Sequence, residues 1–263
     1  MAVIGFIGMG NMGYALLKGI KPVFDEDIIF HRKNVEKMME LAKDENVKFA
    51  KSNKDVVSNA KYIILAVKPQ MFEEIFYEIK DVVTQEHVII SLAPGITIAQ
   101  IKEKLPKAKI VRTMPNTPAM VNAGMTGISF EENTLSEEEE SVVKKIFECV
   151  GAVRVVKESL INSVVCASGS SPAYVFMFIE ALADSAVKCG LPRNDAYEFV
   201  AQTVLGSAKL MLETGKHPGE LKDMVCSPAG TTIAGVEALE QNGFRKSIFA
   251  ATDACFKRCE GIK

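Results

Sequence analysis

Residues that could bind a small anion lie toward the C-terminal end of the chain, where Ser227 to Gly230 precedes the threonine pair Thr231 and Thr232. A proline and small residues interrupt the chain there, and an apolar-periodic segment that predicts a helix follows. Backbone N–H groups and hydroxyls converge at the positive end of such a helix, which favours a negatively charged ligand. An ordinary capped helix start has the same residues, so this stretch alone does not decide between the two.

Three glycines near the N-terminus have the spacing of a phosphate-binding turn. Residues 2–13, AVIGFIGMGNMG, form an apolar run that predicts a strand, a turn at Gly8, Gly10 and Gly13, and the start of a helix. Gly8 permits the tight turn, Gly10 lets the backbone approach a pyrophosphate, and Gly13 lets the helix pack against the strand. Because a strand and a helix flank the glycines, we predict dinucleotide binding rather than a plain glycine-rich turn.

The end of the next predicted strand, residues 27–30, bears on which dinucleotide binds. In this type of fold an acidic residue here binds the ribose 2′-hydroxyl of NAD(H), whereas an arginine accommodates the 2′-phosphate of NADP(H). This chain has no acid at that point but continues with His31, Arg32 and Lys33. We therefore predict NADPH as the preferred cofactor, with NADH as the alternative; a solvated basic start to the helix 34–43 would share these residues.

A central strand is predicted at residues 62–67, YIILAV, because a continuous apolar run is typical of a strand buried on both faces. It ends at Lys68 and Pro69, and ligands of open α/β sheets bind beyond such carboxyl ends. Strands and helices alternate along this part of the chain, which predicts a doubly wound parallel sheet, the Rossmann architecture. Asn116 lies in a later loop between two prolines, which suits either a nicotinamide pocket or a rigid turn.

Two further predicted strands, residues 125–130 and 152–156, are expected to be antiparallel, and the pattern after them is helical only. We place the domain boundary there, which gives a Rossmann domain over 1–158 and an all-α domain over 159–263. The segment 173–189 is apolar on most of its circumference. A domain of about 100 residues cannot surround such a helix alone, so we predict that the all-α domain forms a homodimer.

Composition argues against several classes of function. The chain has 263 residues and a formal net charge of −2, which is unlike a basic nucleic-acid-binding surface. We find no apolar run of the roughly 20 residues that a membrane span needs and no signal peptide, so we expect a cytoplasmic protein that does not bind membranes. Cys255 and Cys259 are four residues apart on a predicted helix, but no histidine or further cysteine is near them in the sequence, so we expect no metal site.

Several motifs together resemble those of one family. They are GFIGMGNMG at 5–13, AVKP at 66–69, MPNTP at 114–118, SGSSPAY at 168–174, and HPG at 217–219 leading to SPAGTT at 227–232. Over nearly its whole length the chain resembles the pyrroline-5-carboxylate reductases, and the last motif is specific to that family. The resemblance implies NAD(P)H-dependent reduction of Δ1-pyrroline-5-carboxylate to L-proline, the last step of proline biosynthesis. It also implies a dimer built by the C-terminal domain, with a larger ring of dimers as a further alternative.

The resemblance implies roles for individual residues as well. Ser227 and the backbone amides of Gly230, Thr231 and Thr232 would hold the substrate carboxylate, and the Thr232 hydroxyl would bond the ring nitrogen. Asn53 matches the family's asparagine near the adenosine ribose. The residues expected to contact the cofactor are Gly8, Gly10, Asn11, Met12, Gly13, His31, Arg32, Lys33, Asn53, Ala66, Val67, Lys68, Pro69, Ala93 and Asn116.

Two departures from the family pattern are Ser171 and Ala229, where glycine is common; both changes are small. The β-hydroxyacid dehydrogenases and imine reductases share the glycine-rich opening, but they have a catalytic lysine that the segment 168–176 lacks. A nucleotide-sensing or structural dimer without catalysis is the remaining alternative. The expected chemistry needs no acid–base pair, because a protonated C=N carbon is already electrophilic and hydride transfer needs mainly alignment and a dry site.

Overall fold

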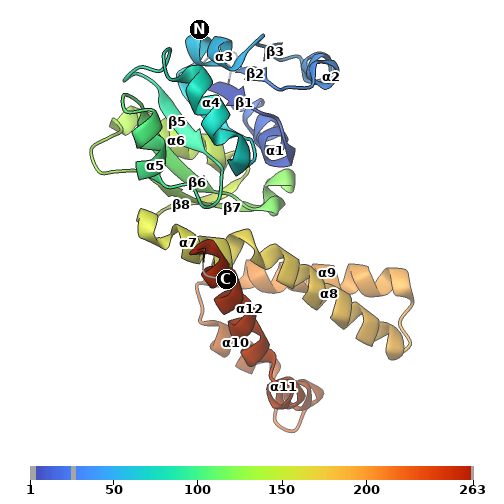
Figure 1. Cartoon of the computed structure of the whole chain (residues 1–263). Helices are drawn as coiled ribbons and strands as arrows, with labels where there is room; N and C mark the ends of the chain where they lie inside the picture. Colours follow the sequence, from blue (N-terminus) through green and yellow to red (C-terminus); the bar gives the residue numbers. More distant parts are fainter. Residues whose placement is uncertain (1–3, 25–27, 262–263) are drawn as a thin grey trace. The chain divides into compact units, whose positions relative to one another are not determined.

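The computed structural model describes residues 4–24 and 28–261, which divide into two compact units (Figure 1). The sheet unit runs to Ser170 and resumes at Phe256, and the helical unit is Ser171–Cys255. Ala2, Val3 and Asp27, which belong to predicted strands, lie outside the described residues.

An eight-stranded sheet forms the centre of the sheet unit. Its strands are β1 (Ile4–Ile7), β2 (Ile28–His31), β3 (Lys48–Phe49), β4 (Tyr62–Leu65), β5 (Val88–Ser91), β6 (Lys109–Met114), β7 (Gly124–Ser129) and β8 (Gly151–Val155). Their spatial order is β3-β2-β1-β4-β5-β6-β7-β8, and all pairs from β3 to β6 are parallel. The predicted doubly wound parallel sheet is therefore confirmed. β1 lies between β2 and β4, where the strand order reverses and where such sheets bind ligands.

The two strands at the far edge differ in direction, so the expectation for them is half correct. β7 is antiparallel to β6, with Thr113 opposite Ile128. β8 is instead parallel to β7, with Gly124 opposite Gly151. The reason is α6 (Glu137–Glu148), which lies between β7 and β8 in the sequence and forms a crossover that returns the chain in the same direction.

Helices cover both faces of the sheet (Figure 1). Besides α6 they are α1 (Asn11–Ile20), α2 (Val35–Glu45), α3 (Asn53–Asn59), α4 (Phe72–Ile79), α5 (Ile98–Lys104) and α7 (Ile161–Val164), with short turns η1 (Pro69–Met71), η2 (Thr117–Val121), η3 (Glu158–Leu160) and η4 (Val165–Gly169). Ile63 and Leu65 of β4 lie in a core with side chains of α3, α4 and α5. Tyr62 and Ile64 lie in a second core with side chains of α1 and α6. Burial on both faces explains the uninterrupted apolar run at 62–67.

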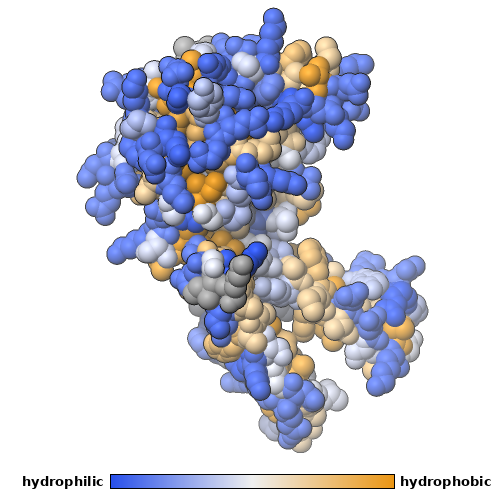
Figure 2. Space-filling view, viewed as in Figure 1, coloured by the Kyte–Doolittle hydropathy of each residue, from blue (hydrophilic) through white to orange (hydrophobic). Residues whose placement is uncertain are grey.

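The helical unit has a small core. Its helices are α8 (Ser171–Lys188), α9 (Arg193–Thr214), α10 (Pro218–Val225), α11 (Thr231–Gln241) and α12 (Phe244–Cys259), the last turn of which belongs to the sheet unit. Ala183, Ala196 and Val200 form its buried cluster. By contrast, Met177 is 67% exposed and Leu212 79% exposed. Figure 2 shows apolar residues along these helices. Exposed apolar faces of this kind are typical of helices that pack against another protein surface.

The helical stretch Glu158–Lys188 is long and apolar enough to cross a membrane by length and composition alone, although we expected no segment of this kind. The expectation is corrected in that respect. One such helix is weak evidence for a membrane span, because a helix that packs against other protein has the same composition.

A buried carboxylate ties α6 to the sheet. Glu139 is 2% exposed and accepts hydrogen bonds from Lys109 Nζ at 2.7 Å and from the Ser136 backbone N–H at 3.0 Å. Lys61 Nζ lies 2.9 Å from the same carboxylate. Burial opposes ionisation of Glu139, but the bonds from Lys109, Ser136 and Lys61 outweigh it and lower its pKa from 4.5 to about 2.

We predict that this cluster makes stability depend on pH. Because the folded pKa lies below the unfolded value, the contribution of Glu139 is complete above pH 4.5 and disappears as the pH falls from 4.5 toward 2. Glu139→Gln should reduce the free energy of unfolding by roughly 1–3 kcal/mol at pH 7 and by less at pH 3. Urea unfolding at both pH values measures this, with the exposed neighbour Glu138→Gln as control. Equal losses at both pH values would contradict the electrostatic explanation.

Candidate functional site

The turn after β1 has a geometry that favours glycine. Gly8 has a φ of +86°, and its N–H donates to the His31 carbonyl at 2.9 Å. A Cβ atom at this position would lie 2.3 Å from Val67 Cγ1 and 2.8 Å from the Ala66 carbonyl oxygen. The missing side chain therefore lets the turn pass directly against the end of β4.

Gly10 leaves an open space in front of α1. A Cβ atom at Gly10 would meet only the Ala66 carbonyl oxygen, at 3.8 Å. Gly10 is the N-cap of α1, no side chain caps this helix, and its first turn holds no acidic residue. The positive helix end and its N–H groups therefore face uncrowded space, which suits a pyrophosphate. Gly13 allows close packing here, since a Cβ atom at that position would lie 2.9 Å from Ala66 Cβ.

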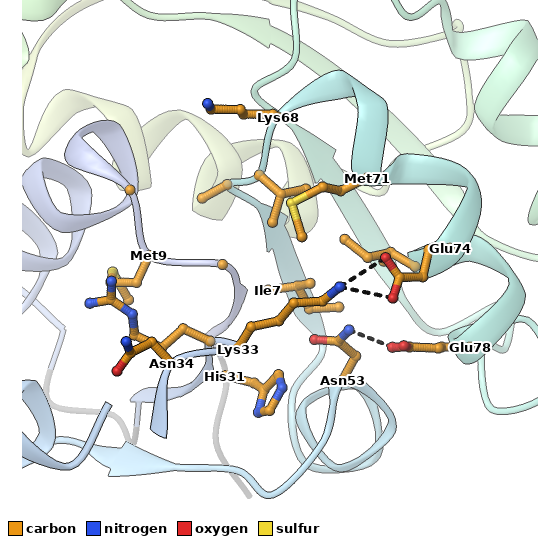
Figure 3. A pocket seen from close by; sticks show the side chains of 16 residues that line it. Ile7, Met9, His31, Lys33, Asn34, Asn53, Lys68, Met71, Glu74 and Glu78 are labelled. Carbon is orange, nitrogen blue, oxygen red and sulfur yellow. Dashed lines mark hydrogen bonds and ion pairs between the residues drawn. The ribbon is translucent and has the colours of Figure 1, made fainter. Parts of the chain in front are cut away.

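A cleft of about 360 Å³ opens beside this turn (Figure 3). We call it the N-terminal cleft; its lining residues are Ile7, Gly8, Met9, Gly10, His31, Arg32, Lys33, Asn34, Asn53, Ala66, Val67, Lys68, Met71, Glu74, Ile75 and Glu78. They come from the ends of β1, β2 and β4, from the segments that follow these strands, and from the first residue of α3. The glycine turn, the open helix end and the basic side chains after β2 together fit a nicotinamide dinucleotide.

The predicted cofactor residues are distributed unevenly. Those in the N-terminal cleft are Gly8, Gly10, His31, Arg32, Lys33, Asn53, Ala66, Val67 and Lys68. Those beside it are Asn11, Met12 and Gly13, in the first turn of α1, and Pro69, the first residue of η1. Ala93 is buried after β5, and Asn116 follows β6, so neither lines this cleft.

The Asn116 side chain ties the loop after β6 to η4 and to β7. Its Nδ2 donates to the carbonyl and the hydroxyl of Ser168, at 3.2 and 3.1 Å, and its Oδ1 accepts from the Met125 N–H at 2.9 Å. Both the nitrogen and the oxygen of the side-chain amide therefore have hydrogen-bond partners within the chain. These bonds fix the position of the loop that contains Asn116.

The lining residues that were not predicted from the sequence include three on α4, Glu74, Ile75 and Glu78. Glu74 accepts from Lys33 Nζ at 2.9 Å, and Glu78 accepts from Asn53 Nδ2 at 2.5 Å (Figure 3). A signal was present, because Met71, Glu74 and Glu78 recur at helical spacing after the strand 62–67 and so share one helix face. Among the described residues, none forms an ion pair with Arg32.

The second predicted site, Ser227 to Thr232, lies in the helical unit. Gly230 is the N-cap of α11, no side chain caps this helix, and its first turn has no acidic residue. The Gly230 N–H donates to the Ser227 carbonyl at 3.1 Å, which folds the loop back on itself. Ala229 has a φ of +56°, a conformation that favours glycine. The substitution of glycine by alanine there thus carries some backbone strain, while the helix N-terminus remains suited to an anion.

Two cysteines lie close together in the structure. The sulfur atoms of Cys166 and Cys259, both in the sheet unit, are within 4.8 Å of each other. The sequence does not show this proximity, because the two residues are far apart in the chain. Two thiols are half of a tetrahedral site, so they do not by themselves indicate a metal.

Comparisons with known proteins cover the whole chain. A family model described as pyrroline-5-carboxylate reductase dimerisation matches residues 158–262. A second one, described as NADP oxidoreductase, coenzyme F420-dependent, matches residues 3–95. A pyrroline-5-carboxylate reductase from Escherichia coli K12 is 45% identical over 98% of this chain and 97% of its own length.

Solved structures agree with these matches. A pyrroline-5-carboxylate reductase from Coxiella burnetii is similar with a TM-score of 0.92 and 34% identity, covering 100% of this chain and 98% of that one. A pyrroline carboxylate reductase from Plasmodium falciparum with NADP bound has a TM-score of 0.86 and 29% identity, covering 99% and 98% of the two chains.

The contrast between the two glycines of the turn gives a prediction. Gly10→Ala should leave the melting temperature nearly unchanged, because its methyl group meets no close atom, but should weaken NADPH binding by roughly tenfold or more. Gly8→Ala should instead destabilise the fold by about 1–3 kcal/mol, because its φ is +86°. Titration calorimetry and thermal unfolding separate the two effects. A Gly10→Ala variant that binds NADPH normally would show that no phosphate lies at this turn.

Proposed function

The chain belongs to the pyrroline-5-carboxylate reductase family, and from this premise we propose which of its residues hold the substrate and the cofactor. The chain is an NAD(P)H-dependent oxidoreductase that reduces Δ1-pyrroline-5-carboxylate to L-proline. The observation that carries this conclusion is 45% identity to a reductase of that name over 98% of the chain.

The substrate is proposed to bind at the start of α11. Ser227 and the backbone amides of Thr231 and Thr232 hold its carboxylate, and the Thr232 hydroxyl bonds the ring nitrogen. Gly230, whose N–H already donates to the Ser227 carbonyl, shapes the loop around the carboxylate. The uncapped helix N-terminus supports this assignment. The cofactor, when bound, supplies a hydride from nicotinamide C4 to the imine carbon. The task of the chain's own residues is to hold that carbon in line and exclude water.

NADPH is proposed as the preferred cofactor, with NADH as a slower alternative. Arg32 follows β2 without an ion-pair partner among the described residues, which leaves it available for a 2′-phosphate. The NADP bound to the Plasmodium falciparum relative supports a nicotinamide dinucleotide as the cofactor. Asn53 is assigned to the adenosine ribose.

The nicotinamide end is assigned to Lys68, Pro69, Ala93 and Asn116, which follow β4, β5 and β6. Their place beyond the carboxyl ends of successive parallel strands supports the assignment. The proposed boundary between the cofactor domain and the helical domain is at 158/159, and the match of the dimerisation family from residue 158 supports it.

We also propose a homodimer that assembles through the helical unit, with a larger ring of dimers as its extension and the cytoplasm as its location. The match to a dimerisation family over residues 158–262 and the exposed apolar side chains of α8 and α9 support assembly. These helices have too small a core to be stable as one copy.

A cofactor-oxidation assay tests the substrate assignment. When Δ1-pyrroline-5-carboxylate is added to the purified protein and NADPH, the absorbance of the reduced nicotinamide should fall rapidly. Thr232→Ala should lower kcat/KM by about 10- to 100-fold, because the imine is no longer aligned, while the Kd for NADPH stays the same. Thr214→Ala, at the end of α9, is the control for loss of a threonine hydroxyl in this unit. Unchanged kinetics in Thr232→Ala would remove this residue from the site.

The dimer is tested by light scattering. The wild-type chain should have at least twice the mass of the 28.7 kDa monomer. Met177→Asp should shift the protein to the monomer, because burying an unpaired carboxylate in an apolar interface costs several kcal/mol of desolvation free energy. Tyr77→Asp is the matched control, because Tyr77 is similarly exposed at 73% but lies on α4 of the sheet unit. A monomer-only wild type, or equal effects of both variants, would contradict the proposed interface.

A further inference from the structure

We propose that Glu74 weakens the binding of 2′-phosphorylated dinucleotides, because it holds Lys33 in an ion pair at the N-terminal cleft. The inference rests on the proposed function, since it assumes that this cleft receives the adenosine end of NAD(P)H. It adds a specificity-determining residue that lies on α4, outside the motif after β2.

The ion pair joins two elements that frame the cleft. Lys33 follows β2, Glu74 lies in the first turn of α4, and Lys33 Nζ is 2.9 and 3.0 Å from the two carboxylate oxygens of Glu74. Figure 3 shows the Lys33 side chain extended toward α4 and joined there to Glu74. In this arrangement the charge of Lys33 is neutralised within the cleft.

A second acid one turn further along reinforces this pattern. Glu78 accepts from Asn53 Nδ2 at 2.5 Å, and Asn53 is the residue assigned to the adenosine ribose. Residues four apart lie on the same helix face, so α4 presents two carboxylates to the cleft. The two carboxylates therefore accept hydrogen bonds from Lys33 and Asn53, whose N–H groups would otherwise be available to the adenosine ribose. Arg32 and Lys68 also line the cleft, and among the described residues neither forms an ion pair.

The charges decide which cofactor is affected. A 2′-phosphate carries close to two negative charges, so it must draw Lys33 away from Glu74 and then lie near the released carboxylate. The 2′-hydroxyl of NADH needs neither step. Because the Lys33 and Glu74 side chains are 66% and 53% exposed, water screens the pair and the effect is moderate. Glu74 therefore narrows the preference for NADPH over NADH without reversing it.

The adenosine fragments 2′,5′-ADP and 5′-AMP test the proposal without catalysis, by titration calorimetry on the full-length protein. Glu74→Gln should tighten 2′,5′-ADP by about three- to tenfold and leave 5′-AMP within about twofold. Glu73→Gln is the matched control: it removes the same charge from the adjacent position, where Glu73 pairs with Lys104 at 3.3 Å and does not line the N-terminal cleft. It should change neither affinity. An unchanged or weakened affinity of Glu74→Gln for 2′,5′-ADP would overturn the proposal, and so would equal tightening of both fragments.

A double-mutant cycle tests the role of Lys33. If Glu74 acts by holding Lys33, the gain from Glu74→Gln should disappear in a Lys33→Gln background. A gain of the same size in both backgrounds would overturn the ion-pair mechanism. In the same variants, the affinity for NADPH should change as that for 2′,5′-ADP does, and the affinity for NADH should change as that for 5′-AMP does. If the wild type reduces Δ1-pyrroline-5-carboxylate but Glu74→Gln behaves as wild type, only this inference fails. If the wild type binds neither dinucleotide, the proposed function fails with it.

Discussion

The close approach of the turn after β1 to the end of β4 is the constraint on which the rest of the sheet unit depends. Gly8 has a left-handed backbone conformation and lies where any side chain would collide with Ala66 and Val67. This contact brings the start of α1, the residues after β2 and the face of α4 around one cleft. A larger residue would separate the helix end from the basic side chains of Arg32 and Lys33. One glycine thus positions the elements around the cleft in which we propose that the phosphates and the adenosine ribose bind.

A second constraint acts on the helical unit. Its buried cluster of Ala183, Ala196 and Val200 is too small to stabilise five helices. The proposed assembly would complete the packing around α11 and the loop 227–232, so it would set the geometry of the proposed substrate site as well as stabilise the unit. It also explains why such apolar helices, including one long enough to span a membrane, occur in this chain.

The features that could be predicted from the sequence are those that local patterns determine. Gly8, Gly10 and Gly13 predicted the phosphate turn because a strand and a helix flank them, and the apolar run 62–67 predicted a strand buried on both faces. The approach of Lys33 to Glu74 was not predicted, because it depends on which helix face the sheet places opposite β2. The parallel direction of β8 and the proximity of Cys166 to Cys259 likewise depend on contacts between distant segments. Such contacts leave no periodic signal in the sequence.

The histidines show how little acid–base chemistry the reaction asks of the chain. His31 Nδ1 lies 3.0 Å from the Ala50 carbonyl, and His87 Nε2 lies 3.0 Å from the Val57 carbonyl. His217 accepts the Gly219 N–H at 3.1 Å and so caps α10. All three histidines of the chain therefore hold backbone in place. A protonated imine is already electrophilic, so the reaction needs alignment rather than a proton donor of matched pKa. The groups proposed to hold the substrate, backbone amides and the Thr232 hydroxyl at the start of α11, meet this requirement, because groups that only position the substrate need not titrate near neutral pH.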